Sequence, residues 1–119
     1  MSYSRSLAIR SAIDLNGLAL GMWETARLLT KESTREAGHR KLNRLRDRVR
    51  SVQARPGISE SLEIYLNQEF APQDYLSLMD RLESGDPKAL MPEIAKLVGD
   101  TNGPLDDVAR DTADLRRAL

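Results

Sequence analysis

The chain has 119 residues, and its 18 Lys and Arg residues balance its 18 Asp and Glu residues, so the formal net charge is zero. The absence of cysteine excludes disulfide scaffolds and thiolate metal sites. A hydrophobic content of 40% at neutral charge excludes an intrinsically disordered chain, and the length corresponds to one domain over residues 1–119.

The N-terminal segment lacks the features of a signal peptide, because Arg10 and Asp14 interrupt its apolar residues. The longest strongly apolar stretch, residues 15–23, contains Asn16 and is much shorter than the roughly 20 residues that a membrane-spanning helix needs. We therefore expect no contact with a membrane and a cytoplasmic location. Arginine outnumbers lysine by 14 to 4, which is compatible with a GC-rich bacterial genome.

Helix-forming residues dominate the sequence, above all Leu, Ala, Arg and Glu. Segments that alternate apolar and polar residues, as strands do, are almost absent. Most glycines and prolines fall between helical segments, where they mark turns. The sequence therefore predicts an all-α fold, a single compact helical domain of five or six helices with a long N-terminal helical hairpin.

The first predicted helix runs from about residue 4 to residue 31. Its apolar residues cover more than one face, which is typical of a helix that is buried on several sides. We therefore expect it to be the central helix of the domain or a helix that is shared with a partner. Gly17 and Gly21 lie four residues apart on one face, where they permit the close approach of another helix.

The second predicted helix begins at Ser33, which forms a capping box with Glu36. A narrow apolar seam follows, of the kind found in helical hairpins and coiled coils, and it consists of Leu42, Leu45, Val49 and Val52. The helix ends at the turn over residues 55–57. The alternative is one continuous helix from residue 4 to residue 55, since no proline interrupts this stretch.

Shorter helices are predicted in the second half of the chain. Ser59 is expected to cap a third helix, and Pro72 is expected to begin a fourth, because proline suits a first helical turn. Gly85 ends the fourth helix. Asp86 is expected to cap a fifth helix, which Pro92 kinks or splits.

The last predicted helix follows a turn over residues 100–104 and begins at residue 105 or 106. It is expected to pack on the other helices through an inner face made of Leu105, Val108, Thr112, Leu115 and Leu119. The domain then consists of a basic N-terminal hairpin, about residues 4–55, and an acidic bundle of shorter helices, about residues 58–119.

Charge is divided unevenly along the chain. Residues 1–55 hold 12 basic and 5 acidic residues, a net charge of +7, whereas residues 56–119 hold 6 basic and 13 acidic residues, a net charge of −7. Three interpretations stay open. The charges form solvated faces of one fold, or the two halves meet between subunits of a homodimer, or the basic helix binds an acidic partner, whether nucleic acid or protein.

The sequence carries no recognisable catalytic constellation. His39 is the only histidine, and we interpret it as a surface residue on a basic helix. No thiol nucleophile, glycine-rich phosphate loop or serine-hydrolase motif is present. Asp107, Asp111 and Asp114 share one face of the last helix, but they flank its apolar stripe rather than replace it. We therefore predict no enzymatic activity, no catalytic residue, no cofactor and no metal site.

Binding to another protein is the predicted function. The first helix has more apolar surface than a peripheral helix needs, and Met22 and Trp23 are side chains of the kind that anchors interfaces. The sequence predicts a non-enzymatic regulator, such as an inhibitor, antiactivator or adaptor, that binds a larger regulator or enzyme and blocks its assembly or dimerisation. It also predicts a homodimer. The predicted interface residues are Leu15, Leu18, Leu20, Met22, Trp23 and Leu29.

Two alternative functions are carried forward. In the first, a nucleic-acid-associated transcriptional regulator uses the basic helix over residues 40–55, with the contacts Arg40, Arg44, Arg48 and Arg55. The acidic half of the chain and the lack of interleaved aromatic residues for base stacking weaken this alternative. In the second, a small helical enzyme uses carboxylates, and Asp107 and Asp111 converge in a pocket with an acid from another helix.

Overall fold

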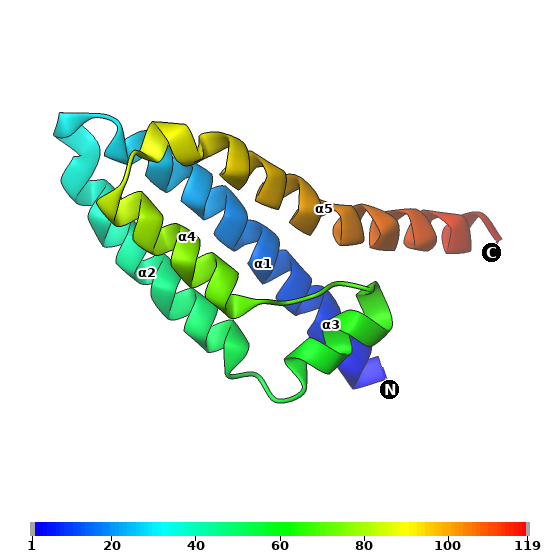
Figure 1. Cartoon of the computed structure of the whole chain (residues 1–119). Helices are drawn as coiled ribbons and strands as arrows, with labels where there is room; N and C mark the ends of the chain where they lie inside the picture. The colour runs from blue at the N-terminus through cyan, green and yellow to red at the C-terminus, as the bar shows by residue number, and fades with distance from the viewer. Residues whose placement is uncertain (1, 119) are drawn as a thin grey trace.

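The structure, a computed structural model, describes residues 2–118. Over this range the chain forms five α-helices, one short 3-10 helix and no strand, so the predicted all-α fold is confirmed (Figure 1). In chain order the elements are α1 (Ser2–Leu29), η1 (Glu32–Thr34), α2 (Arg35–Gln53), α3 (Ile58–Leu66), α4 (Pro72–Ser84) and α5 (Pro87–Ala118).

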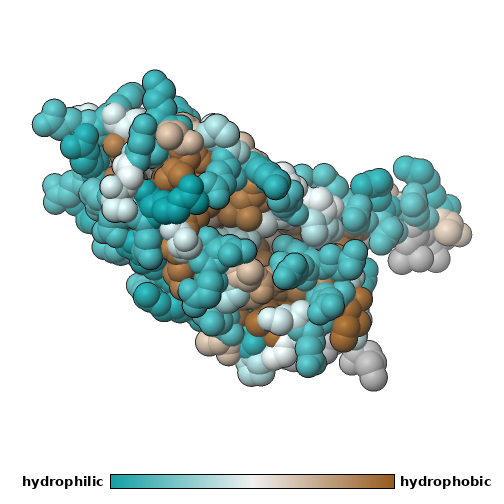
Figure 2. All heavy atoms as spheres, in the orientation of Figure 1, coloured by the Kyte–Doolittle hydropathy of each residue, from teal (hydrophilic) through white to brown (hydrophobic). Residues whose placement is uncertain are grey.

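Helix α1 is the centre of the fold, and it forms the predicted N-terminal hairpin with α2 (Figure 1). Helices α2, α3 and α5 pack directly on α1, whereas α4 packs mainly on α2. Polar residues cover most of the face shown in Figure 2, with hydrophobic residues visible between them. The fully buried apolar residues of α1 lie mostly three or four positions apart and are Ala8, Ala12, Leu15, Leu18, Ala19, Met22 and Ala26.

A short turn joins α1 to α2, so the alternative of one continuous helix from residue 4 to residue 55 is wrong. The predicted capping box is also wrong, because α2 begins at Arg35 and no side chain caps its N-terminus. The Thr34 hydroxyl instead donates a hydrogen bond to the Leu28 carbonyl oxygen at 2.7 Å. This bond stabilises the exit of the chain from α1, where the last carbonyl oxygens have no partner within the helix.

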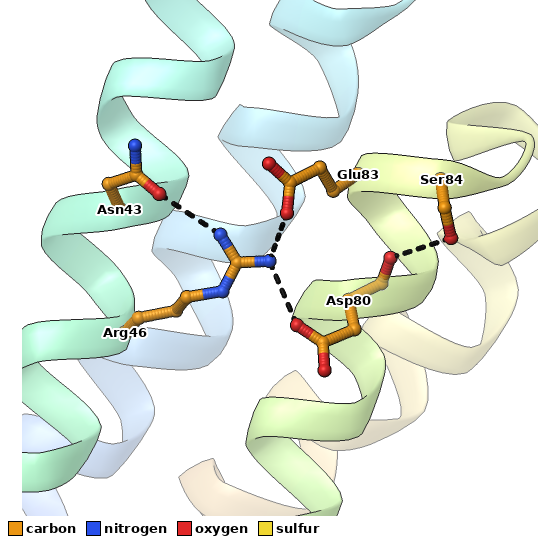
Figure 3. A network of polar contacts seen from close by, with 5 residues as sticks. All are labelled: Asn43, Arg46, Asp80, Glu83 and Ser84. Atoms are coloured by element: carbon orange, nitrogen blue, oxygen red, sulfur yellow. Dashed lines mark hydrogen bonds and ion pairs between the residues drawn. The ribbon is translucent and has the colours of Figure 1, made fainter.

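Arg46 connects α2 to α4 (Figure 3). Its guanidinium donates to Asn43 Oδ1 on its own helix at 3.0 Å, to Asp80 Oδ1 on α4 at 2.9 Å, and to the carboxylate of Glu83 on α4. Burial lowers the pKa of Arg46, but the hydrogen bonds to the two carboxylates outweigh it, and the net shift is upward. Part of the charge division is therefore neutralised within one chain.

Residues with left-handed backbone flank both ends of α3. Gly57 has a φ of 71° and is the N-cap, so Ser59 does not cap this helix as predicted. Asn67 has a φ of 48° and follows the last residue of α3. A left-handed residue cannot continue a right-handed helix, so the chain runs through a non-helical segment over residues 67–71 before α4 begins.

The predicted starts of the fourth and fifth helices are confirmed, whereas no separate helix begins at residue 105 or 106. Pro72 is in the first turn of α4, and Gly85 follows the last residue of that helix. The carboxylate of Asp86 accepts a hydrogen bond from the backbone N–H of Lys88 at 3.1 Å, at the start of α5. Both features depend on local chemistry alone, which explains why the sequence predicts them well.

Helix α5 is continuous, so a split at Pro92 and the predicted turn over residues 100–104 are both wrong. A proline inside a helix costs about 3 kcal/mol, but the packing of α5 on α1 opposes that cost. Ile94 is fully buried. Asn16 of α1 donates a hydrogen bond to Thr101 Oγ1 at 3.1 Å, in the stretch where the turn is predicted.

The last part of α5, residues 105–118, extends past the other helices as a C-terminal arm (Figure 1). The predicted inner face of this segment is packed only at its start. Leu105 contacts the core, Val108 is half-buried and Thr112 is exposed. The side chain of Leu115 and all of Leu119, which complete the predicted face, lie outside the described residues.

Substitutions of two helical glycines are expected to change stability in opposite directions. No atom of another helix lies within 4 Å of the position of a Cβ at Gly17, so Gly17→Ala raises the free energy of unfolding by about 0.5–1 kcal/mol through helix propensity. A Cβ at Gly38 would lie 2.8 Å from Leu29 Cδ2 and 3.2 Å from Leu28 Cβ. Because these contacts are too close, Gly38→Ala lowers the free energy of unfolding by about 1–3 kcal/mol. Urea unfolding of both variants measures the two values, and a shift of the same sign in both contradicts the expectation.

Candidate functional site

Four of the six predicted interface residues are buried within the chain itself. They are between 0% and 5% exposed and belong to the hydrophobic core: Leu15, Leu18, Met22 and Leu29. The prediction is therefore wrong for these four, because they pack against the chain's own helices and leave no surface for a partner. Of the other two, Trp23 is half-buried against the core and Leu20 is 50% exposed.

A smaller apolar surface remains on the outer side of α1. Ile13 and Leu20 are 54% and 50% exposed, and they lie two helical turns apart on the same face. Gly17 lies between them with no atom of another helix near it, so the surface there is flat and open. We call this surface, made of Ile13, Gly17 and Leu20, the α1 face.

Ion pairs between α1 and α2 border the α1 face. Lys41 of α2 donates to Glu24 Oε2 at 2.9 Å, and Glu24 lies one turn beyond Leu20 on α1. The hydrogen bond and the positive charge of Lys41 lower the pKa of Glu24. Next to Ile13, Arg55 of the turn that follows α2 donates to Asp14 Oδ2 at 2.5 Å. The two pairs connect α2 and this turn to α1 beside the face.

The predicted basic surface is smaller in the structure than in the sequence. Arg55 is half-buried, and it donates to Ser11 Oγ at 2.8 Å as well as to Asp14. Its prediction as a nucleic-acid contact is therefore corrected to an internal bond from the turn after α2 to α1. Arg40 is exposed and pairs with Glu36 on its own helix at 3.3 Å.

Two arginines of the predicted basic surface remain exposed beside the α1 face. Arg48 lines a hollow of about 200 Å³ at the junction of α1 and α2, together with Leu18 and Asp14. Arg44 lies one turn before Arg48 on the same side of α2. Neither arginine has an ion pair with another residue in the range 2–118. The α1 face and these two arginines together form the α1–α2 face.

The carboxylates of the C-terminal arm do not form the pocket that the enzyme alternative expects. Asp107 is exposed and pairs with Arg110 on the same helix at 2.9 Å, and Asp111 is also exposed. Across the described residues, no group of three or more His, Cys, Asp or Glu side chains is placed to hold a metal ion. His39 is half-buried on α2, among basic neighbours.

The sequence prediction omits Ile13, although this residue is the more exposed of the two large side chains on the face. Apolar residues occur on most sides of α1, so periodicity alone does not identify the side that the other helices leave uncovered. Only the polar residues along that side, Arg10, Glu24 and Arg27, carry a signal in the sequence. They recur with Ile13, Gly17 and Leu20 at helical spacing and mark a face that is in contact with solvent.

Comparison of the chain with protein-family models, with curated proteins and with solved structures gives no match. None of the helices formed by residues 2–118 combines the length and the apolar character that crossing a bilayer requires. Arguments about function therefore depend on the side chains of this chain alone.

Lys41→Gln is expected to raise the pKa of Glu24 toward its ordinary value of 4.5, because it removes the hydrogen bond and the positive charge. In the native protein the lowered pKa of Glu24 adds stability that is present above pH 4.5 and is lost as the pH falls through the lowered pKa. The share of this pH-dependent stability that comes from Lys41 is lost in the variant. A ¹³C titration of the Glu24 carboxyl group by NMR measures the pKa in both proteins.

Lys31→Gln is the control, since it removes a lysine at the same end of the molecule that has no ion pair with a described residue. An unchanged Glu24 pKa in Lys41→Gln, or an equal rise in both variants, contradicts the specific role of the Lys41–Glu24 pair.

Proposed function

We propose that the protein is a non-enzymatic regulatory protein that binds a larger regulator or enzyme and blocks its assembly or dimerisation. The α1–α2 face is the proposed binding surface. The observation that carries this proposal is the half-exposure of Ile13 and Leu20 on the helix whose other sides form the core. A partner that binds there contacts a rigid surface, which lowers the entropic cost of association.

The chemistry of the α1–α2 face favours one kind of partner. Its centre is apolar, and the exposed guanidinium groups of Arg44 and Arg48 lie along its α2 side. Arginine forms forked hydrogen bonds with carboxylates and tolerates burial in interfaces. We therefore propose that the occupant is an amphipathic helix of another protein, with apolar residues toward Ile13 and Leu20 and acidic residues toward the two arginines.

The proposed mechanism is occlusion. A helix of the partner that packs on the α1–α2 face is no longer free to pack within the partner's own assembly. Trp23 lies three residues beyond Leu20 on α1, is half-buried against the core, and adds apolar surface to the proposed contact. The cytoplasm of a bacterial cell is the proposed setting, and a homodimer through the same face is the competing occupant.

A nucleic-acid-associated regulator is the second candidate, and the exposure of Arg44 and Arg48 is the observation that favours it. The internal bond of Arg55 to Asp14 removes one of the four predicted phosphate contacts. Phosphate contacts weaken steeply as the salt concentration rises, whereas apolar contacts hardly change. Salt dependence therefore separates the two candidates.

Leu20→Asp is expected to reduce capture of the partner from native lysate at least tenfold, because loss of an interface anchor costs about 2 kcal/mol. The double variant Arg44→Gln and Arg48→Gln is expected to reduce capture of the partner several-fold. Ile64→Asp is the matched control, since Ile64 is 72% exposed on α3, away from this face. Affinity capture with nuclease and at high salt, read by mass spectrometry, measures all four proteins, and thermal unfolding shows that they fold equally.

One stoichiometric protein that the native chain and Ile64→Asp retain, and that cross-links to the α1–α2 face through an acidic amphipathic helix, supports the proposal. Equal capture by Leu20→Asp overturns it. Loss of all captured material after nuclease treatment overturns it in favour of nucleic acid. A bait-only result, with a mass in solution that rises with concentration and falls in Leu20→Asp, overturns it in favour of a second copy.

A further inference from the structure

A groove runs between α4 and α5, away from the α1–α2 face. It consists of two adjoining hollows of about 320 Å³ and 330 Å³. The hollows share four lining residues, which are Asp74 and Tyr75 of α4 and Leu97 and Asp100 of α5. We call this feature the α4–α5 groove. On the face in view, hydrophobic residues are visible between hydrophilic ones (Figure 2).

The floor of the groove is apolar and aromatic. Tyr75 is 6% exposed, and its ring packs edge-to-face on Phe70 with the ring centroids 6.0 Å apart. Leu97 and Leu78 add aliphatic surface, and Pro104 closes one end. The Tyr75 ring is therefore held firmly in the position where it lines both hollows.

One buried polar atom in the groove lacks a hydrogen-bond partner among the described residues, and it belongs to Gln68. Tyr75, which lines the same hollow, is almost fully buried. Burial, with a smaller contribution from the charge of Asp100, raises the pKa of Tyr75 to about 12, so the hydroxyl keeps its proton at neutral pH. Gln68 is 8% exposed, lines the same hollow, and has an Oε1 atom without a donor. Unpaired polar atoms in buried positions are costly, and a ligand with several N–H donors satisfies them.

The rim of the groove is acidic. The carboxylates of Asp74, Asp100 and Glu69 line it, and none of them is within ion-pair distance of a basic side chain in residues 2–118. Glu93 is neutralised by Arg81 at 2.9 Å, and Lys96 is the one other basic residue among those that line the two hollows. Asp74 and Asp100 belong to facing helices, so a cation in the groove interacts with both.

We infer that the α4–α5 groove binds an arginine side chain of a partner protein, with the guanidinium between Asp74 and Asp100 and one of its N–H groups donating to Gln68 Oε1. A guanidinium is planar, weakly hydrated and rich in donors, so it forms forked hydrogen bonds with carboxylates and still has a donor for an amide oxygen. A lysine ammonium has fewer donors and no planar fork. The two adjoining hollows also have room for the residues on either side of the arginine in the partner chain. A free cation would leave this space unfilled.

This inference is independent of the proposed function, because it uses α4, α5 and residues 67–71 rather than α1 and α2. The probe is a capped peptide that contains one arginine between two leucines. Its two counterparts contain lysine or citrulline, a neutral isostere of arginine, at the same position. Titration of the ¹⁵N-labelled full chain by NMR measures the dissociation constant and the residues whose signals move.

The arginine peptide is expected to shift signals around Tyr75, Leu97 and Asp100. Citrulline is expected to raise the dissociation constant at least tenfold, and lysine about threefold. Asp74→Asn and Asp100→Asn are each expected to raise it about threefold to fivefold. Both carboxylates are exposed, so these variants keep the fold. Asp111→Asn, which removes the same charge from the C-terminal arm, is the control and leaves the constant unchanged.

Several outcomes overturn the inference. Equal binding of the citrulline peptide shows that the groove recognises apolar residues only. Signals that move over all acidic parts of the chain, or an equal effect of Asp111→Asn, show a general attraction of charges. Signal changes that depend on protein concentration without peptide, and that vanish in Asp74→Asn, assign the groove to an arginine of a second copy instead.

Discussion

The burial of α1 on several sides is the constraint on which the rest of the structure depends. Leu15, Leu18 and Met22 are fully buried, and helices α2, α3 and α5 all pack on this one helix. No other helix contributes as many residues to the core. The α1 face with Ile13 and Leu20 is what remains of α1 after these helices have covered the rest, so the candidate site is a consequence of the packing.

Two arginines hold the helices in position. Arg46 connects the basic half of the chain to the acidic half, because it bonds α2 to Asp80 and Glu83 of α4. Arg55, in the turn after α2, bonds to Asp14 of α1. Both guanidinium groups are shielded, and their partners are partly open to solvent. The ion pairs of Arg46 and Arg55 therefore act mainly by fixing the relative positions of the helices, because exposed ion pairs contribute little to the free energy of unfolding.

Two surfaces of opposite chemistry remain after these internal bonds. The α1–α2 face is apolar with a border of free arginines, and the α4–α5 groove is aromatic with a border of free carboxylates. They are formed by different helices, so each can be occupied or disrupted without the other. The function proposed above uses the first surface and the further inference uses the second, so the two proposals can be tested separately.

The sequence by itself determined the helical class, the hairpin and the helix starts at Pro72 and Asp86, because propensity and capping depend on neighbouring residues. Only the tertiary structure decided the rest. Contacts from α1, including Asn16 to Thr101, keep α5 helical through residues 100–104. The pairing of Arg55 with Asp14 and the exposure of Ile13 depend on how distant segments meet. Because α1 has apolar residues on several sides, the local sequence does not show which of these sides another helix covers. Periodicity alone therefore could not separate the core residues of α1 from its surface residues.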